Sequence, residues 1–148
     1  FDEGLEVITS LLQNRTTNFA GRYYQLTDAL CEPKPLQKKL PIAVGGKGPN
    51  RTLRSVARWA DHWDTVATSP GEWQKLNEIL VQRCAEIGRN PDEILRSAHL
   101  FWNFDADPKQ LADEAAAFHV VGVDLVIFSM RGPYEVRLLE PLANALRG

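Results

Sequence analysis

The sequence has few of the residues that build metal centres, disulfide frameworks or membrane spans. Its two cysteines, Cys31 and Cys84, lie outside any CxxC or Cys/His spacing, and its three histidines are equally scattered. This scarcity predicts incidental or buried thiols in a reducing cytoplasm, and no protein-bound metal. Long apolar runs are also absent, since none approaches the ~20 residues of a membrane-spanning helix. We therefore expect a cytoplasmic protein with no membrane partner.

An excess of one charge is lacking as well. The chain has 17 Lys and Arg residues against 19 Asp and Glu residues, a formal net charge of −2, so its overall charge gives no reason to expect nucleic acid as a partner. What remains is an ordinary globular composition, with 44% hydrophobic residues in 148 positions. A chain of this length can bury a core as one domain.

Short apolar segments alternate with amphipathic ones over most of the chain. Strands are predicted at 41–45, 62–68, 97–104 and 124–130, and helices at about 49–60, 70–88, 108–121 and 133–147. Before them, helical spacing predicts a helix over 1–13, and residues 15–40 predict an irregular connection with a short hairpin in 18–26. The alternation implies crossover connections and a parallel sheet, hence an α/β fold.

Two architectures are compatible with four such βα units. They are half of a (βα)8 barrel, which needs ~250 residues, or they form an independent open sheet of four strands. Periodicity does not separate the two, because the units look the same in both. The chain starts at Phe1 within a helical pattern, so we expect a piece of something longer.

Four segments share the residue pattern of a capped helix start. Each has a capping residue, then proline at the first helical position, then Glu or Gln two places later: Ser69-Pro70-Gly71-Glu72, Asn90-Pro91-Asp92-Glu93, Asp107-Pro108-Lys109-Gln110 and Gly132-Pro133-Tyr134-Glu135. The cap and the acidic or amide side chain satisfy amide groups that the first helical turn leaves unpaired.

The segment Gly48-Pro49-Asn50-Arg51 departs from this pattern. Its cap is a glycine without a side-chain acceptor, and Arg51 replaces the acidic residue. Unpaired amides, the positive end of the helix dipole and added cations favour an external anion, and glycines allow the backbone to approach it. The predicted phosphate site comprises Gly45, Gly46, Lys47, Gly48, Arg51 and Thr52. The alternative is a glycine turn that only joins strand to helix, since the segment matches neither the nucleotide-triphosphate loop nor the dinucleotide fingerprint.

Several stretches resemble the C-terminal half of the luciferase-like flavin or deazaflavin oxidoreductases. They are "FDEGLEVITSLL", "FAGRYYQL", "PKPLQKKLPIAVGGKGPNRTLRSVARWADHWD" and "GVDLVIFSM". The long stretch is similar to the family pattern P-x-x-x-GG-x-G-x-x-RTL-x-x-x-A-x-x-ADGW. Asp61-His62-Trp63 stands where the family has Asp-Gly-Trp, which puts a bulkier side chain at a strand start.

The resemblance implies a (βα)8 TIM barrel of which residues 1–148 form the C-terminal half, the N-terminal half being absent. It places a cofactor across the C-terminal mouth, with its phosphate on the six residues of the predicted phosphate site. The sequence of the stretch "GGKGPNRTLRSVARWADHWD" resembles most the family members that use coenzyme F420, and FMN is the alternative cofactor.

The implied function is hydride transfer between F420 and a small-molecule substrate. Two alternatives stay open: an FMN-dependent monooxygenase of the same family, and a non-catalytic α/β module that binds a phosphorylated ligand or a protein. A half barrel leaves strand edges and inner-face side chains exposed. We therefore expect the isolated chain to self-associate, for example as a homodimer. The resemblance also places most contacts to the cofactor ring and substrate on the first half of the barrel, so it implies that the isolated chain is nearly inactive.

No nucleophile–His–Asp motif is recognisable, so the catalytic residues are left unassigned. In a barrel, the polar residues at the strand ends would face the mouth, although roles in turns or caps are favoured for them: Thr68, Asn103, Asp105, Ser129 and Arg131. His62 is expected at a strand start, away from catalysis. Aromatic side chains are expected to pack, with Trp63, Trp102 and Phe104 in the barrel wall and Tyr23-Tyr24 on the hairpin.

Overall fold

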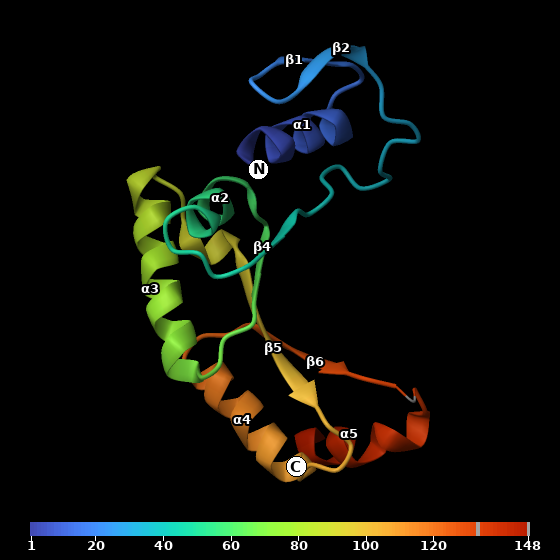
Figure 1. Cartoon of the computed structure of the whole chain (residues 1–148), viewed down its shortest axis with the longest axis vertical. Coiled ribbons are helices and arrows are strands. Elements are labelled where there is room, and N and C mark those ends of the chain that lie inside the picture. The colour runs from blue at the N-terminus through green and yellow to red at the C-terminus, as the bar shows by residue number, and fades with distance from the viewer. Residues whose placement is uncertain (133, 148) are drawn as a thin grey trace. The chain divides into compact units, whose positions relative to one another are not determined.

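The computed structural model describes residues 1–132 and 134–147, and the chain divides into two compact units, Phe1–Ile42 and Ala43–Gly148 (Figure 1). Each unit is described by itself below. Among the described residues, no helix is long and apolar enough to cross a membrane.

The first unit consists of a helix and a hairpin, as the sequence predicts. Its elements are α1 (Asp2–Gln13), β1 (Thr17–Ala20) and β2 (Gln25–Ala29), and the two strands pair antiparallel. Glu3 of α1 accepts hydrogen bonds from the backbone N–H groups of Arg22 (3.0 Å) and Tyr23 (2.8 Å) in the hairpin turn. These hydrogen bonds lower the pKa of Glu3 below its usual value, and the bond from Tyr23 has the largest effect. The carboxylate thus joins the hairpin to the helix.

The second unit contains the four predicted βα repeats. Its elements are β3 (Ala43–Gly45), α2 (Thr52–Trp59), β4 (His62–Thr65), α3 (Pro70–Glu86), η1 (Pro91–Glu93), β5 (Leu95–Trp102), α4 (Pro108–Val120), β6 (Leu125–Met130), η2 (Val136–Leu138) and α5 (Glu140–Arg147). All strand pairs are parallel, and the spatial order β3-β4-β5-β6 is the order along the chain.

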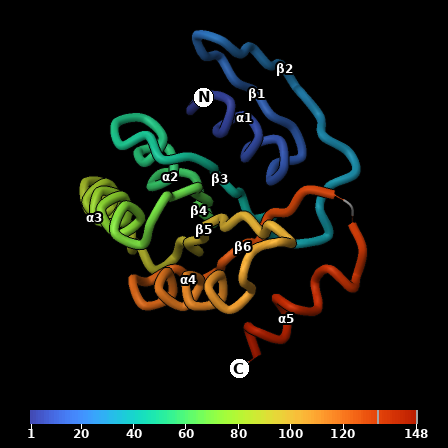
Figure 2. Tube along the Cα trace, turned by 60° about the horizontal axis from the view of Figure 1, so that its bottom comes forward, coloured from blue at the N-terminus to red at the C-terminus, as the bar shows by residue number. Residues whose placement is uncertain are grey.

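This winding decides between the two architectures left open by the sequence. A doubly wound open sheet reverses its strand order and carries helices on both faces. Here each strand is added beside the preceding one, and α2, α3 and α4 follow one another along one side of the sheet (Figure 2). The unit is therefore a partial (βα)8 barrel, with a helix-covered outer face and an inner face.

The core lies between the sheet and its helices. Trp63 of β4 is fully buried and stacks on Trp73 of α3, with ring centroids 5.8 Å apart and an interplanar angle of 26°. Trp102 is also buried, which agrees with the expected wall position of both strand tryptophans. Because side chains alternate along a strand, the neighbours of Trp63 in sequence, His62 and Asp64, lie on the inner face.

Two of the four predicted caps begin α-helices. Ser69 accepts a hydrogen bond from the amide of Glu72 (3.1 Å) at the start of α3, and Asp107 accepts one from Lys109 (2.9 Å) at the start of α4. Asn90 also caps, but the segment that it starts is only the 3-10 turn η1. Short proline-led turns use the same chemistry as helices.

The predicted helix over 133–147 is wrong in its first half. Pro133 lies outside the described residues, and beyond it the chain forms the short turn η2 and then α5 from Glu140. The backbone of Glu135 is extended (φ −119°, ψ 135°), so no continuous helix passes through it. Pro141, at the second position of α5, marks the actual start, because proline is tolerated in the first helical turn and not in the interior.

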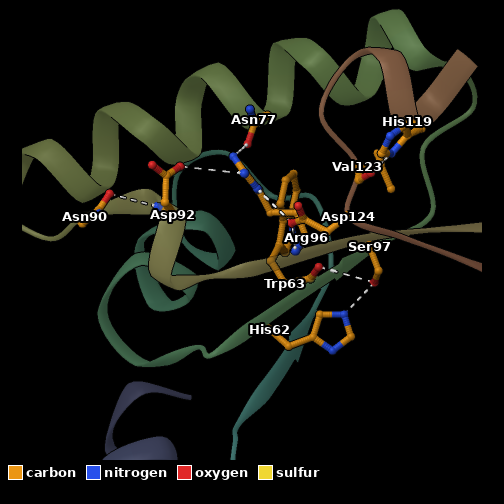
Figure 3. A network of polar contacts seen from close by, with 10 residues as sticks. All are labelled: His62, Trp63, Asn77, Asn90, Asp92, Arg96, Ser97, His119, Val123 and Asp124. Atoms are coloured by element: carbon orange, nitrogen blue, oxygen red, sulfur yellow. Dashed lines mark hydrogen bonds and ion pairs between the residues drawn. The ribbon is translucent and has the colours of Figure 1, made fainter.

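A network around Arg96 fixes the amino ends of β5 and β6 (Figure 3). The backbone N–H of Arg96 and its side-chain Nε both donate to Asp124 Oδ2, at 2.8 and 3.4 Å. The guanidinium also reaches Asn77 of α3 (3.5 Å) and Asp92 of η1 (3.9 Å). These contacts join two strands, a helix and a turn at the end of the sheet opposite the glycine turn.

Candidate functional site

The glycine turn, residues 45–48, lies at the carboxyl end of β3 and leads into α2. Gly46 has a left-handed backbone conformation (φ +123°) that favours glycine. Its N–H donates to the carbonyl oxygen of Asp64 (2.9 Å), and its own carbonyl accepts a hydrogen bond from Trp63 Nε1 (2.8 Å). Strand β4 therefore holds the turn through both polar groups of one residue.

The turn packs closely against the first residue of α2. A Cβ at Gly46 would lie 3.1 Å from Thr52 Cγ2, and a Cβ at Gly48 would lie 2.8 Å from Thr52 Oγ1. Larger residues would therefore push against Thr52. The two glycines keep this backbone bare of side chains beside the threonine hydroxyl.

The start of α2 lacks the side-chain cap found at α3 and α4. The predicted cap at Gly48 is wrong, because residues 49–51 form a turn and the N-cap is Arg51, whose side chain makes no capping hydrogen bond. The backbone satisfies part of the turn, because Leu53 N–H donates to Gly48 O (3.0 Å) and Ser55 N–H to Arg51 O (3.1 Å). The positive end of the helix dipole stays without a carboxylate from its own first turn.

A carboxylate from α3 occupies the other side of the glycine turn. Lys47 Nζ forms an ion pair of 2.8 Å with Glu72 Oε1, and Thr68 donates to Glu72 Oε2 through its N–H and hydroxyl. The hydrogen bond from Lys47, followed by those from Thr68, lowers the pKa of Glu72 to about 2. Glu72 is thus ionised and offsets the charge of Lys47. The turn role favoured for Thr68 is confirmed.

The structure brings the six residues of the predicted phosphate site together on one turn and one helix start. Two of their donors are engaged within the protein: the N–H of Gly46 and the ammonium of Lys47. Arg51 carries an exposed side chain, and Thr52 is half-buried beside the glycines. Any bound anion would therefore depend mainly on Gly48, Arg51 and Thr52.

A second polar cluster lies on the inner face and extends over three strands. His99 of β5 contacts Asp64 of β4 through Nε2 (3.1 Å to Oδ2) and Ser129 of β6 through Nδ1 (2.9 Å to Oγ). Ser97 Oγ donates to Asp64 Oδ1 (2.6 Å) and meets His62 Nε2 at 2.7 Å, the latter contact being visible in Figure 3. His62 begins β4, as expected, and it takes part in this cluster.

A cavity of about 420 Å³ opens at the carboxyl ends of β5 and β6. It is lined by Phe101, Trp102, Asn103, Phe104, Ser129, Arg131 and Gly132. Ser129 belongs to both the cavity lining and the polar cluster, so the cluster adjoins the cavity at this residue. Phe104 meets Trp102 edge to face with ring centroids 6.2 Å apart.

Sequence reasoning did not identify three residues of this cluster: Asp64, Ser97 and His99. A signal was present, because strand residues two apart point to the same face, and His62-x-Asp64 and Ser97-x-His99 are polar at that spacing. Polar side chains repeated on one face of a buried strand indicate a polar interior. Among residues 1–132 and 134–147, no cluster of three or more His, Cys, Asp or Glu side chains could hold a metal ion.

Comparison with known proteins relates residues 1–144 to one family. The sequence model of the family described as luciferase-like monooxygenase matches residues 1–144. The "Pyrimidine monooxygenase RutA" of Bradyrhizobium sp. is 31% identical over 91 residues, covering 60% of this chain and 25% of that protein. The chain thus spans about a quarter of the length of that curated relative.

Solved structures share the fold at low sequence identity. An F420-dependent secondary alcohol dehydrogenase, in complex with an F420-acetone adduct, superposes with a TM-score of 0.81 at 16% identity, covering 99% of this chain and 61% of that one. A long-chain alkane monooxygenase superposes with a TM-score of 0.74, also at 16% identity, covering 99% of this chain and 55% of that one.

Proposed function

Because the chain belongs to the luciferase-like monooxygenase family, we propose that it forms the phosphate-binding half of an oxidoreductase that uses coenzyme F420. In this proposal the glycine turn after β3 holds the cofactor phosphate, and the enzyme transfers hydride to or from a small organic molecule. The observation that carries the proposal is the uncapped start of α2 behind a bare glycine turn, at the carboxyl end of the sheet.

The residues at this turn fit a phosphate group in three respects. Gly46 and Gly48 pack closely against Thr52, which places the Thr52 hydroxyl beside backbone that carries no side chain. The helix dipole of α2 is not neutralised by an acidic residue in its own first turn. Arg51 and the Thr52 hydroxyl supply a cation and a hydrogen-bond donor.

The ion pair between Lys47 and Glu72 limits the contribution of Lys47. Its charge is already balanced, so Lys47 adds little net attraction for an anion while the pair is intact. In the proposal, Arg51 is the main charged contact. Lys47 orients the turn by anchoring it to α3.

When bound, a deazaflavin supplies or accepts the hydride, and the protein supplies position and electrostatics. In barrels of this type the reaction takes place at the carboxyl ends of the strands, where the glycine turn and the cavity both lie. We propose that the reaction needs the remainder of the barrel and that the isolated chain retains cofactor binding with little turnover.

FMN is the second candidate, with monooxygenation as its reaction. Two of the relatives, the pyrimidine monooxygenase and the long-chain alkane monooxygenase, are monooxygenases. We favour F420 because the stretch "GGKGPNRTLRSVARWADHWD" resembles the members that use F420 more closely than those that use FMN.

Fluorescence titration with F420 and with FMN tests the proposal directly. We expect saturable binding of F420 with an affinity at least about tenfold above that of FMN, and loss of binding in Gly46→Asp and in Arg51→Glu, because each introduces a carboxylate at the phosphate position. Arg58→Glu is the matched control, since Arg58 lies in the last turn of the same helix and stacks over Trp59.

Each result separates the candidates. Tighter binding of FMN would replace F420 by FMN and favour a monooxygenase. Unchanged affinity in both charge-reversal variants would make the glycine turn purely structural. If neither F420 nor FMN binds, and inorganic phosphate or a phosphorylated metabolite binds instead, the non-catalytic α/β module is favoured.

A further inference from the structure

Three side chains on adjacent strands form a continuous line of hydrogen-bonding groups. Asp64, His99 and Ser129 come from β4, β5 and β6, and His99 uses one ring nitrogen for each neighbour, 3.1 Å to Asp64 and 2.9 Å to Ser129. About a quarter of each side chain of the His99–Asp64 pair is exposed (24% and 28%). Partial burial strengthens the interaction of the pair relative to an exposed one.

The chemistry of the three groups determines how a proton can move along this line. An ionised carboxylate only accepts hydrogen bonds, so Nε2 of His99 carries a proton towards Asp64. In the neutral ring Nδ1 is then an acceptor for the Ser129 hydroxyl, and in the protonated ring it is a donor to Ser129 Oγ. The direction of the Ser129 hydroxyl proton therefore follows the charge of His99.

Asp64 is held in place for this role. Ser97 Oγ donates to Asp64 Oδ1 at 2.6 Å, which leaves Oδ2 directed at His99. The carbonyl of Asp64 also accepts the N–H of Gly46. His62, a further titratable side chain, contacts Ser97 at the edge of this line.

The far end of the line opens into the cavity of about 420 Å³. Its wall is aromatic at Phe101, Trp102 and Phe104, and Phe101 is 67% exposed. Its polar lining residues include Ser129, Asn103 and Arg131. Such a lining suits a small molecule with an apolar or aromatic body, an oxygen near Ser129 and an anionic group near Arg131.

We propose that this cavity binds a small carboxylate-bearing carbonyl compound, or the corresponding alcohol, and that Ser129, positioned by His99 and Asp64, exchanges a proton with its oxygen. The inference rests on the proposed oxidoreductase function, which supplies the hydride donor or acceptor. Ser129 is the group that touches the substrate, and His99 and Asp64 act through it.

The proton balance closes for both directions of reaction. For a carbonyl substrate, the carbon gains a hydride, the oxygen gains the Ser129 hydroxyl proton, and His99 Nδ1–H replaces that proton, so the imidazolium becomes neutral. For an alcohol, the same steps run in reverse and leave an imidazolium stabilised by Asp64. Water restores the starting charge of His99 after each cycle.

The experiment measures ligand binding and the histidine ring together, without cofactor. The full 148-residue chain is labelled with ¹⁵N at histidine and titrated with benzoylformate, an aromatic 2-oxo acid. We expect saturable binding that shifts the ¹⁵N signals of His99. His119 of α4, which faces Val123 O at 3.2 Å, serves as the internal control and should not move.

Variants separate the two parts of the proposal. Arg131→Gln should weaken benzoylformate binding about tenfold and leave acetophenone, which lacks the carboxylate, unaffected. Ser129→Ala should keep benzoylformate binding within about threefold and abolish the response of His99, and Ser129→Thr should restore that response. The circular dichroism spectrum of each variant checks that it folds.

Three results would overturn the proposal: no binding of benzoylformate, binding without a response of His99, or equal affinity of the unmodified chain for benzoylformate and acetophenone. Titration of the same variants with F420 and FMN distinguishes this failure from failure of the proposed function. If the cofactor still binds but the ¹⁵N signals of His99 do not respond, only the proposed proton transfer through Ser129 and His99 is refuted.

Discussion

The indole Nε1 of Trp63 donates a 2.8 Å hydrogen bond to the carbonyl oxygen of Gly46, which joins the packed core to the glycine turn. Trp73, which stacks on Trp63, differs in one respect. Its Nε1 is buried and has no hydrogen-bond partner among the described residues. The two rings thus contribute similar buried area but different hydrogen bonding.

This difference predicts unequal costs for the two Trp→Phe variants. Trp63→Phe removes ring volume and a hydrogen bond, and it leaves the Gly46 carbonyl without its indole donor. Trp73→Phe removes ring volume together with an unpaired N–H. We expect Trp63→Phe to lower the free energy of unfolding by about 1–3 kcal/mol more than Trp73→Phe does, in urea titrations. Equal losses would mean that the Trp63 bond adds nothing to stability.

A second prediction concerns the left-handed conformation of Gly46. Gly46→Ala should destabilise the fold by about 1–3 kcal/mol, because φ is +123° and the new Cβ would lie 3.1 Å from Thr52. Gly71→Ala is the matched control. A Cβ there meets nothing within 4 Å, and alanine favours the helix, so the control should be neutral or slightly stabilising. Thermal unfolding of both variants measures the contrast.

Glu72 gives a third prediction, on the pH dependence of stability. Its pKa falls from 4.5 to about 2 in the folded chain, so its contribution is complete above about pH 4.5 and is lost as the pH falls towards 2. The urea unfolding midpoints of the unmodified chain and of Glu72→Gln should therefore approach each other as the pH falls through this interval. Lys47→Met, which removes the largest cause of the shift, should reduce the pH-dependent difference. Parallel pH profiles of the unmodified chain and Glu72→Gln would contradict the assignment.

The two cysteines should differ in reactivity. Cys84 is fully buried in α3, and burial raises the pKa of its thiol, whereas Cys31 is half-buried. Since the thiolate is the reactive form, Ellman's reagent should modify Cys31 at least about tenfold faster than Cys84 in the folded chain, and both at similar rates in denaturant. Cys31→Ser should remove the fast phase. A fast phase that survives in this variant would show that α3 opens readily.

Self-association of the isolated chain stays a prediction. Phe101 and Leu125 lie on the inner face of the sheet and are 67% and 44% exposed, which favours pairing with a second copy. Size-exclusion chromatography with light scattering should show a dimer at micromolar concentration, and Phe101→Asp should shift it towards monomer. A monomer across the same concentration range would count against the pairing.

The periodic part of the fold could be predicted from the sequence. Each βα repeat of the second unit was found, because buried strands and amphipathic helices leave strong local patterns. Ser69 and Asp107 gave correct helix starts for the same reason. The break before α5 was missed, since the pattern from Tyr134 onward stays amphipathic although the backbone of Glu135 is extended.

Long-range pairing explains what the sequence could not show about the sites. Glu72 was identified only as a helix-start acid, and its ion pair with Lys47 depends on α3 lying beside the glycine turn. Asp64 and His99 are 35 positions apart and meet only through the register of β4 with β5. The glycine turn itself was predictable, because left-handed backbone and an uncapped helix start both leave local signals.

The one-sided winding of the sheet gives the two sets of strand residues different freedom to vary. Trp63, Ala98 and Leu100 are fixed by the helices that cover them, so substitutions there would unsettle the whole unit. Their alternating neighbours, such as Asp64 and His99, contact one another and the hydroxyl groups of Ser97 and Ser129. Evolution can therefore change the inner-face residues to suit a new substrate, while the helix-facing residues that stabilise the fold stay the same.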